Sequence, residues 1–347
     1  MKRLFFILIV LISACTKDEI SSELMLNVDV EQAIPDYKSI VTGTTLPNNS
    51  TIGLYIFYAE DVDPHVQLNP YGEKYMNIRS VYSNGSWEYR FDKTSSTNNF
   101  KNIYLIDPRT DDSRLGFTIY SYAPWMTGAE DITEIPFVLG GSSKAVTDLM
   151  WASQNETSAN ARILPNGDPK TVNLSFKHAL AMLRFGFKCR YENTQMKASS
   201  ITLRKKTMNT DGTPASAVTP LYASGNFNGI NGTFSSLQES GAMGLTVSYT
   251  DDNIIFNNSG YTYLPVLIIP SDYSDGYEDG DYEVVFNFND HQLDFVYSIS
   301  APSGSELDLE FEAGHTYTFN FIFDNQIRFE NISISNQWQS QQRDIEF

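Results

Sequence analysis

The side chains most able to do chemistry in this sequence are four histidines, two cysteines and a dense group of carboxylates. The histidines stand far apart, and none has another histidine or a cysteine at the spacing of metal ligands. His178 follows Ser175 at a distance that could suit a general base beside a nucleophile. No acidic residue that would orient the imidazole is near in sequence, so we interpret His178 as a structural histidine.

The carboxylates gather between residues 272 and 283, where they could bind Ca²⁺ through oxygen ligands. They are Asp272, Asp275, Glu278, Asp279, Asp281 and Glu283. Their spacing does not fit the Asp-x-Asp-x-Asp-Gly register of a calcium-binding loop. The favoured interpretation is therefore a solvated hairpin loop.

Other signatures of catalysis are missing from the sequence. It contains no His-Glu-x-x-His, no Cys-x-x-Cys, no Gly-x-Ser-x-Gly and no phosphate-binding loop. Cys189 has no neighbour in sequence that would lower the pKa of its thiol, so it is predicted to be a small core residue. Tryptophans can stack on sugars, but core or interface positions are favoured for Trp87, Trp125, Trp151 and Trp338. We predict no enzymatic activity, no cofactor and no bound metal.

Charge and composition narrow the class of protein further. The chain of 347 residues has 42 acidic against 24 basic residues, a net charge of −18. That charge argues against a nucleic acid partner, because phosphate binding needs a basic face. Aromatic residues make up 13% of the chain and charged residues 19%, which excludes disorder, a coiled coil and a polytopic membrane protein. This balance favours a β-rich extracellular protein.

The first 14 residues predict export. Lys2 and Arg3 precede an apolar run over residues 4–12 and then small residues, which is the pattern of a secretory signal peptide. The run is about half the length that spans a bilayer as a helix. Cys15 directly after Ser13 and Ala14 resembles the bacterial lipobox, which implies cleavage before Cys15 and lipid on its thiol and amine. Several acyl chains on one residue suffice for stable membrane anchoring.

The residues after Cys15 refine the location. Lys17 is followed by Asp18 and Glu19, which resembles the export signal of cell-surface lipoproteins in Gram-negative anaerobes. We therefore expect a lipoprotein exposed on the surface of the outer membrane. Since Cys15 would carry lipid, only Cys189 remains, and no structural disulfide is expected.

Strand patterns dominate the rest of the chain. Residues 24–30 alternate apolar and polar, and residues 52–58 form a nearly all-apolar run typical of a strand buried on both faces. Asn84-Gly85 between two apolar segments predicts a tight hairpin. Further strands are expected at 115–123, 172–176, 183–189, 261–269, 282–288 and 315–323, with a single helical turn at 178–182. Many short strands separated by turn clusters predict an all-β protein of two tandem β-sandwich domains.

A turn-rich stretch over residues 139–171 is the expected domain boundary. The expected division is a signal peptide at 1–14, a lipid-anchored leader at 15–22, an N-terminal sandwich at 23–165 and a C-terminal sandwich at 166–347.

The order of several motifs resembles the fimbrillin family, whose members are the subunits and anchors of type V pili. The motifs that carry the resemblance are the lipobox at Cys15, the strand at 24–30, and the segments 51–57, 148–152, 174–185, 263–270, 313–319 and Trp338. The segment 174–185, Leu-Ser-Phe-Lys-His-Ala-Leu-Ala-Met-Leu-Arg-Phe, is the most specific of them. The resemblance implies two transthyretin-like β-sandwiches and a place in a cell-surface fimbria that supports adhesion.

It also implies assembly by strand exchange with other fimbrial subunits. A protease would cut after the first strand, that strand would leave, and the C-terminal strand of a neighbouring subunit would fill the groove. The leaving strand would then present Leu24, Leu26, Val28 and Val30, and the donor segment Phe329, Ile332, Ile334 and Trp338.

One departure from the family pattern leaves the role open. The family is processed at an arginine after the first strand, but no arginine occurs between Arg3 and Arg79. The candidate processing site is therefore the bond between Lys38 and Ser39. An uncut chain would act as a pilus anchor or accessory subunit, so shaft, tip and anchor roles stay open. The alternative is a surface lipoprotein that does not polymerise and binds glycans or another host or bacterial ligand.

Overall fold

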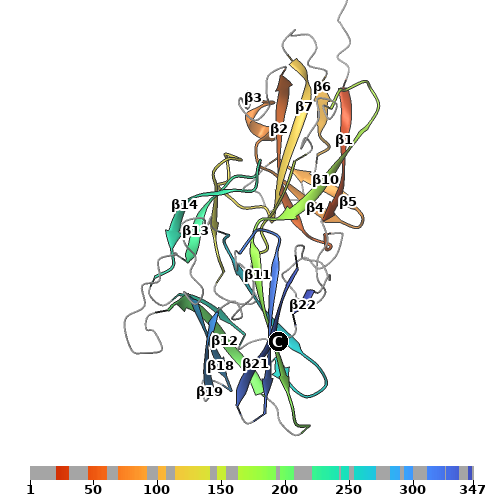
Figure 1. Cartoon of the computed structure of the whole chain (residues 1–347). Helices are drawn as coiled ribbons and strands as arrows, with labels where there is room; N and C mark the ends of the chain where they lie inside the picture. The colour runs from red at the N-terminus through yellow and green to blue at the C-terminus, as the bar shows by residue number, and fades with distance from the viewer. Residues whose placement is uncertain are drawn as a thin grey trace, which may run out of the picture.

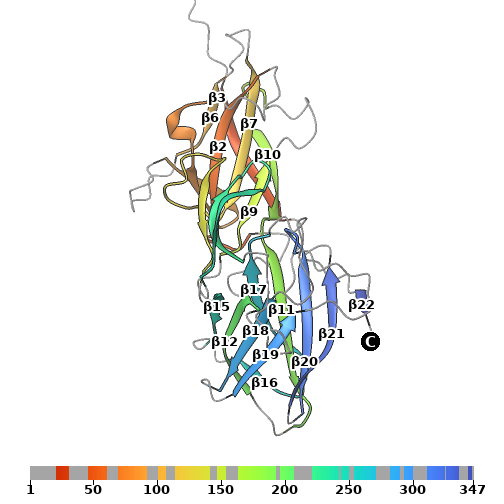
Figure 2. The same ribbon diagram turned by 60° about the vertical axis from the view of Figure 1, so that its left-hand side comes forward.

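The computed structural model confirms the all-β class. It describes residues 21–30, 46–60, 69–91, 101–106, 114–140, 147–153, 163–192, 196–206, 221–241, 244–249, 254–270, 282–289, 293–299, 311–324, 326–335 and 343–345. Within these ranges the regular structure consists of strands and a single 3-10 turn, Glu73–Tyr75. In the views of Figures 1 and 2 the molecule is elongated, with two lobes stacked end to end.

One lobe contains a nine-stranded sheet in the order β5-β4-β2-β7-β9-β10-β1-β6, with β3 paired to β2. Its strands are β1 (Ser21–Val30), β2 (Thr51–Glu60), β3 (Asn69–Pro70), β4 (Ile78–Ser83), β5 (Ser86–Arg90), β6 (Tyr104–Ile106), β7 (Arg114–Ala123), β9 (Met150–Ser153) and β10 (Lys170–His178). The predicted strand at 52–58 lies within β2, where residues 52–57 are all buried. Its alternate side chains enter two different cores, which explains the continuous apolar run.

The other lobe packs two sheets face to face. One has the order β17-β11-β20-β21-β22 and the other β15-β12-β18-β19, with β16 paired to β12. Phe185 of β11 meets Phe286 of β18 between them, with ring centroids 5.1 Å apart. The strands are β11 (Ala181–Cys189), β12 (Met196–Lys205), β15 (Leu245–Ser248), β16 (Ile255–Phe256), β17 (Thr262–Ile268), β18 (Tyr282–Phe288), β19 (Leu293–Ile299), β20 (Thr316–Phe323), β21 (Ile327–Ser335) and β22 (Arg343–Ile345).

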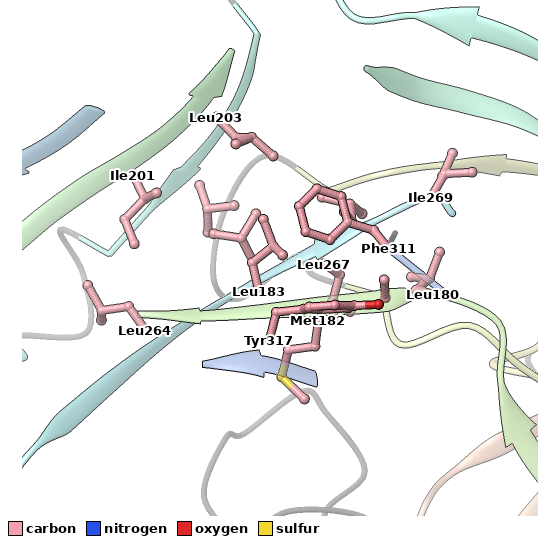
Figure 3. Close-up of a cluster of buried hydrophobic side chains, with 14 of the residues drawn as sticks. Leu180, Met182, Leu183, Ile201, Leu203, Leu264, Leu267, Ile269, Phe311 and Tyr317 are labelled. Atoms are coloured by element: carbon pink, nitrogen blue, oxygen red, sulfur yellow. The ribbon is translucent and has the colours of Figure 1, made fainter. Parts of the chain in front are cut away.

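The core of this lobe continues into the junction. Figure 3 shows Leu183 of β11 and Leu180, directly before that strand, in one group of buried apolar side chains with Leu203, Leu267 and Phe311. The same cluster extends to Tyr55 and Tyr122, which lie on one face of the nine-stranded sheet. A separate cluster, which includes Leu54 and Ile119, covers the other face of that sheet.

A small third sheet pairs segments that are distant in the sequence. It is a three-stranded sheet of β8 (Ile135–Val138), β13 (Tyr222–Phe227) and β14 (Phe234–Glu239), with β13 in the centre. Figure 1 shows β13 and β14 beside the junction of the lobes. Its loop packs on the large sheet at Gly232, where an added Cβ would lie 2.4 Å from Nε1 of Trp151.

The hairpin predicted at Asn84-Gly85 is confirmed. β4 and β5 pair from Arg79 opposite Arg90 to Ser83 opposite Ser86, and the two turn residues have φ of 52° and 87°. Positive φ at both central residues is the geometry that Asn-Gly favours in two-residue hairpins.

The helical turn predicted at residues 178–182 is wrong. His178 ends β10 and Ala181 already begins β11, so the chain passes from one sheet into the next within two residues. The small residues there are buried, and backbone bonds to the residues just before β9 and β20 replace a local turn: Ala179 N–H donates to Leu149 O and Met182 N–H to His315 O.

The expected second domain, from residue 166, begins with a strand of the first lobe. β10 pairs with β1 and β9 in the nine-stranded sheet, and the strands of the second lobe follow from β11 onward.

Candidate functional site: the first strand and its groove

β1 buries alternate side chains, as its sequence predicts. Leu24 and Val30 are buried, while Leu26 and Val28 are partly buried and pack against the same cluster. Met25, on the opposite face, is 50% exposed. The side chains predicted for a leaving strand thus all point into one apolar core.

The pairing of β1 is uneven along its length. On one side it runs parallel to β10, from Leu24 opposite Lys170 to Val30 opposite Phe176. On the other side it pairs antiparallel with the three-residue strand β6, at residues 21–23. Among the described strands of this sheet, β1 and β10 form the only parallel pair. β1 is therefore held chiefly through a single neighbour.

The groove that β1 fills has an apolar floor. Its buried residues include Ile103, Leu105, Val172, Leu174 and Phe176. Without β1, this floor and the backbone groups of β10 that pair with β1 would face water or another strand. Unpaired strand edges and exposed apolar floors are both unfavourable, so an empty groove would bind an extended segment with alternating apolar side chains.

Polar contacts set the register of β1 at both faces. Ser22 is fully buried, and its Oγ accepts hydrogen bonds from the backbone N–H of Asn166 at 3.0 Å and of Gly167 at 3.2 Å. On the outer face, Nδ2 of Asn27 donates to Oδ1 of Asn173 at 2.9 Å. A shift by one residue would break these bonds and turn the apolar side chains outward.

The predicted donor segment lies partly in β21. Ile332 is buried, Phe329 and Ile334 are partly buried, and the Phe329 ring stacks on Tyr297 with centroids 5.1 Å apart. β21 pairs with β20 along its length and with the short β22 on its other side. In this arrangement Phe329, Ile332 and Ile334 pack in the hydrophobic core of their own chain.

Several predicted positions lie outside the described residues. They are Cys15, Lys38, Ser39, Trp338 and the acidic group from Asp272 to Asp281. Its last member, Glu283, is described on β18, where its carboxylate accepts from Nε of Arg204 at 2.6 Å.

His178 is buried in the junction and has an acidic partner that the sequence did not reveal. Its Nδ1 lies 2.9 Å from Oδ1 of Asp148, and both side chains are 2% exposed. Thirty residues separate the pair, and the pairing of β10 with β9, which begins two residues after Asp148, brings them close. Ser175 is exposed and faces away from His178 across β10, so the two do not form a nucleophile and base.

Cys189 and the described tryptophans, the other residues considered for catalysis or binding, pack against neighbouring residues of the fold. Cys189 is fully buried, which raises the pKa of its thiol, so its prediction as a core residue is confirmed. Trp151 packs on Gly232, and Trp87 on Tyr82. In the described part of the chain, no group of three His, Cys, Asp or Glu side chains is placed to hold a metal. None of the described helices is long and apolar enough to cross a membrane.

Comparison with known proteins identifies the family. The model of the fimbrillin-like family matches residues 41–338, which is most of the chain. The chain belongs to the fimbrillin-like family. That membership makes it a fimbrial protein of the cell surface. A search of curated proteins found no match to it.

Solved structures share the fold of this fimbrillin-like chain. A "putative cell adhesion protein" from Bacteroides ovatus ATCC 8483 is 17% identical with a TM-score of 0.51, covering 90% of this chain and 96% of that one. A "putative cell adhesion protein" from Bacteroides uniformis ATCC 8492 is 11% identical with a TM-score of 0.50, covering 92% and 99%. At these identities the likeness shows a common fold over nearly the whole chain.

Proposed function

We propose that this protein is a fimbrial subunit that joins its neighbours by strand exchange, after export as a lipoprotein anchored in the outer membrane through Cys15. The observation that carries the proposal is β1, which lies in an apolar groove and is held chiefly by one parallel neighbour. Membership of the fimbrillin-like family supports it.

Cleavage at the bond between Lys38 and Ser39 would free β1 from the rest of the chain, since β1 precedes every other described strand. Its departure would open one edge of β10 and the floor formed by Val172, Leu174 and Phe176. A strand from another subunit would restore the backbone pairing, and its alternate side chains would replace Leu24, Leu26, Val28 and Val30.

The donor would come from the C-terminal end of the candidate segment. Donation of Phe329, Ile332 and Ile334 would require β21 to leave β20, at the cost of a buried apolar cluster. β22 pairs over only three residues at the sheet edge, and its release would cost far less. We therefore place the donor after Ser335, in the part of the chain that includes Trp338. Figures 1 and 2 show β22 in the other lobe from β1, which favours donation to a neighbouring molecule.

The test is limited proteolysis of the purified chain from residue 16 onward with a lysine-specific protease, followed by N-terminal sequencing and size analysis. We expect a new N-terminus at Ser39, loss of residues 16–38 and a ladder of stable multimers. A Lys38→Gln variant is the matched control and should keep β1 attached to the chain and stay monomeric. A second variant that ends at Ser335 should be cut normally but should not extend the ladder.

The opposite result has a defined meaning. If cleaved residues 21–30 stay bound, or Lys38 is never cut, and the protein remains monomeric, strand exchange is refuted for this chain. A permanently lipidated anchor or a ligand-binding surface lipoprotein would then account for its family membership.

A further inference from the structure

The start of β1 contacts a turn, whereas the rest of the strand pairs with β10. This pairing begins at Lys170, which lies opposite Leu24. Two residues before Leu24, Oγ of Ser22 accepts from the backbone N–H of Asn166 at 3.0 Å and of Gly167 at 3.2 Å. Consecutive N–H groups that converge on one oxygen form a pocket for an acceptor. We call these two N–H groups the amide pair.

Contacts within the turn itself hold the amide pair in place. Pro165 and Pro169 flank the turn, and their rings fix φ on both sides of it. Oδ1 of Asn166 accepts from the backbone N–H of Asp168 at 3.2 Å. Gly167 has φ of 95°, a conformation that glycine adopts without strain. We therefore expect the amide pair to keep its geometry when β1 leaves, so that little entropy is lost when another strand fills the site.

The place that Ser22 fills is closed to water, because Ser22 is fully buried. A side chain that takes this place is expected to be covered in the same way. A hydroxyl there accepts from the amide pair, whereas an apolar side chain leaves both N–H groups without the oxygen that they face, which is unfavourable in a buried place. The amide pair therefore distinguishes strands by their side chains, which backbone pairing with β10 does not.

The amide pair also fixes a register that the apolar floor leaves ambiguous. A strand with alternating apolar residues can shift by two positions and still point apolar side chains into the groove, because the period of a strand is two. Only one position along the strand lies against the amide pair. A shift of β1 by two residues would bring Leu24 there in place of Ser22, and leucine has no acceptor.

We propose that the amide pair of Asn166 and Gly167 selects and aligns the incoming strand. The partner is an extended segment that takes the place and direction of β1. It carries a side-chain hydroxyl two residues before the first of its inward apolar residues, as Ser22 precedes Leu24. The inference rests on the proposed strand exchange, because the amide pair becomes available only when β1 has left.

The experiment measures which peptides enter the groove. The full chain from residue 16 onward is cut with the lysine-specific protease in the presence of excess fluorescent peptide of residues 21–30, which contains no lysine. Bound peptide is measured by fluorescence anisotropy after gel filtration. We expect the parent peptide to bind the cut chain and not the uncut chain, in which β1 already fills the groove.

Peptide variants test the hydroxyl. Ser22→Ala should bind about tenfold more weakly, because it loses the acceptor for the amide pair. Ser22→Cys should bind as weakly, because a thiol keeps a similar shape but is a poor acceptor. Ser21→Ala is the matched control, since Ser21 is only half-buried and points to the opposite face of the strand. It should bind like the parent peptide.

Hydrogen exchange of the uncut chain tests the contact without any strand exchange. Proline has no N–H, so the signal of residues 165–169 comes from Asn166, Gly167 and Asp168 alone. In the Ser22→Ala protein this segment should exchange about tenfold faster than in the Ser21→Ala protein, because the amide pair has lost its acceptor. Equal exchange rates in the two proteins would overturn the proposal.

The peptide results separate the two levels of the argument. If the parent peptide binds and Ser22→Ala binds equally well, the amide pair does not select the strand, although strand exchange stands. The proposal is equally wrong if Ser21→Ala and Ser22→Ala weaken binding alike. If the cut chain takes up no peptide at all, the groove does not accept strands, and the proposed function fails together with this inference.

Discussion

At the residue scale, the polar and aromatic groups in the junction show how contacts distant in sequence fix the fold. The hydroxyl of Tyr55 donates to Ala129 O at 2.5 Å, and the hydroxyl of Tyr122 donates to Oδ1 of Asn77 at 2.9 Å. Burial raises the pKa of both tyrosines, which therefore stay protonated. The Asp148–His178 pair belongs to the same class of contact, in which sequence identifies the residue but not its partner.

Gly232 offers a test at this scale. It has φ of 76° and lies against Trp151, so Gly232→Ala meets both a strained backbone and a steric clash. We expect a loss of about 2–4 kcal/mol in the free energy of unfolding, measured by urea denaturation. Gly128 has φ of 79° with nothing within 4 Å of an added Cβ. Gly128→Ala is therefore the control for the backbone alone and should cost about 1 kcal/mol. Equal losses in the two variants would show that Trp151 does not pack there as described.

At the scale of elements, the sequence predicts strands correctly where a single pattern, such as alternation or a turn motif, is present without a competing one. Alternation places residues 24–30 in β1, and Asn84-Gly85 marks the β4–β5 hairpin. The prediction fails at residues 178–182. The small and apolar residues there are compatible with either a turn or a strand, and backbone hydrogen bonds to neighbouring segments select the extended conformation. The groove could be predicted only in part, since alternation gives the inward residues of β1 but not that β10 would be its partner.

The alternation in β1 makes neighbouring residues differ sharply in their contribution to stability. Leu24 is 1% exposed and Met25 is 50% exposed. We expect Leu24→Ala to lower the free energy of unfolding by about 2–5 kcal/mol, because it leaves a cavity in the apolar cluster against which β1 packs. Met25→Ala should change it by less than about 0.5 kcal/mol. Chemical denaturation of the uncleaved chain measures both, and similar losses would mean that β1 does not occupy the groove in solution.

At the scale of the whole molecule, the two lobes share one core. The cluster that contains Tyr55 and Tyr122 continues without a break to Phe319 and Phe321 in the other lobe. The sheet of β8, β13 and β14 adds backbone bonds between residues 135–138 and 224–227. The turn-rich stretch that predicts a boundary in the sequence thus begins directly after β8, one strand of that sheet.

This continuity predicts cooperative unfolding. Differential scanning calorimetry of the uncleaved chain should show one transition, with a ratio of calorimetric to van't Hoff enthalpy of about 1. Phe137→Ala, which removes a ring of β8 from the shared cluster, should lower the melting temperature without splitting the peak. Two separate transitions in the parent protein would show that the lobes fold independently.

The pairing of β1 with β10 also has a consequence for the synthesis of the chain on the ribosome. Asn27 and its partner Asn173 are 146 positions apart, so the first strand is synthesised long before the strand beside which it will lie. At ribosomal speeds of about 5–20 residues per second, that interval is on the order of ten seconds. Throughout it, the nascent chain carries an apolar strand with an open edge, which other chains can pair with. Production of this protein should therefore be sensitive to crowding among newly made copies, and a chaperone that shields extended segments should raise its yield.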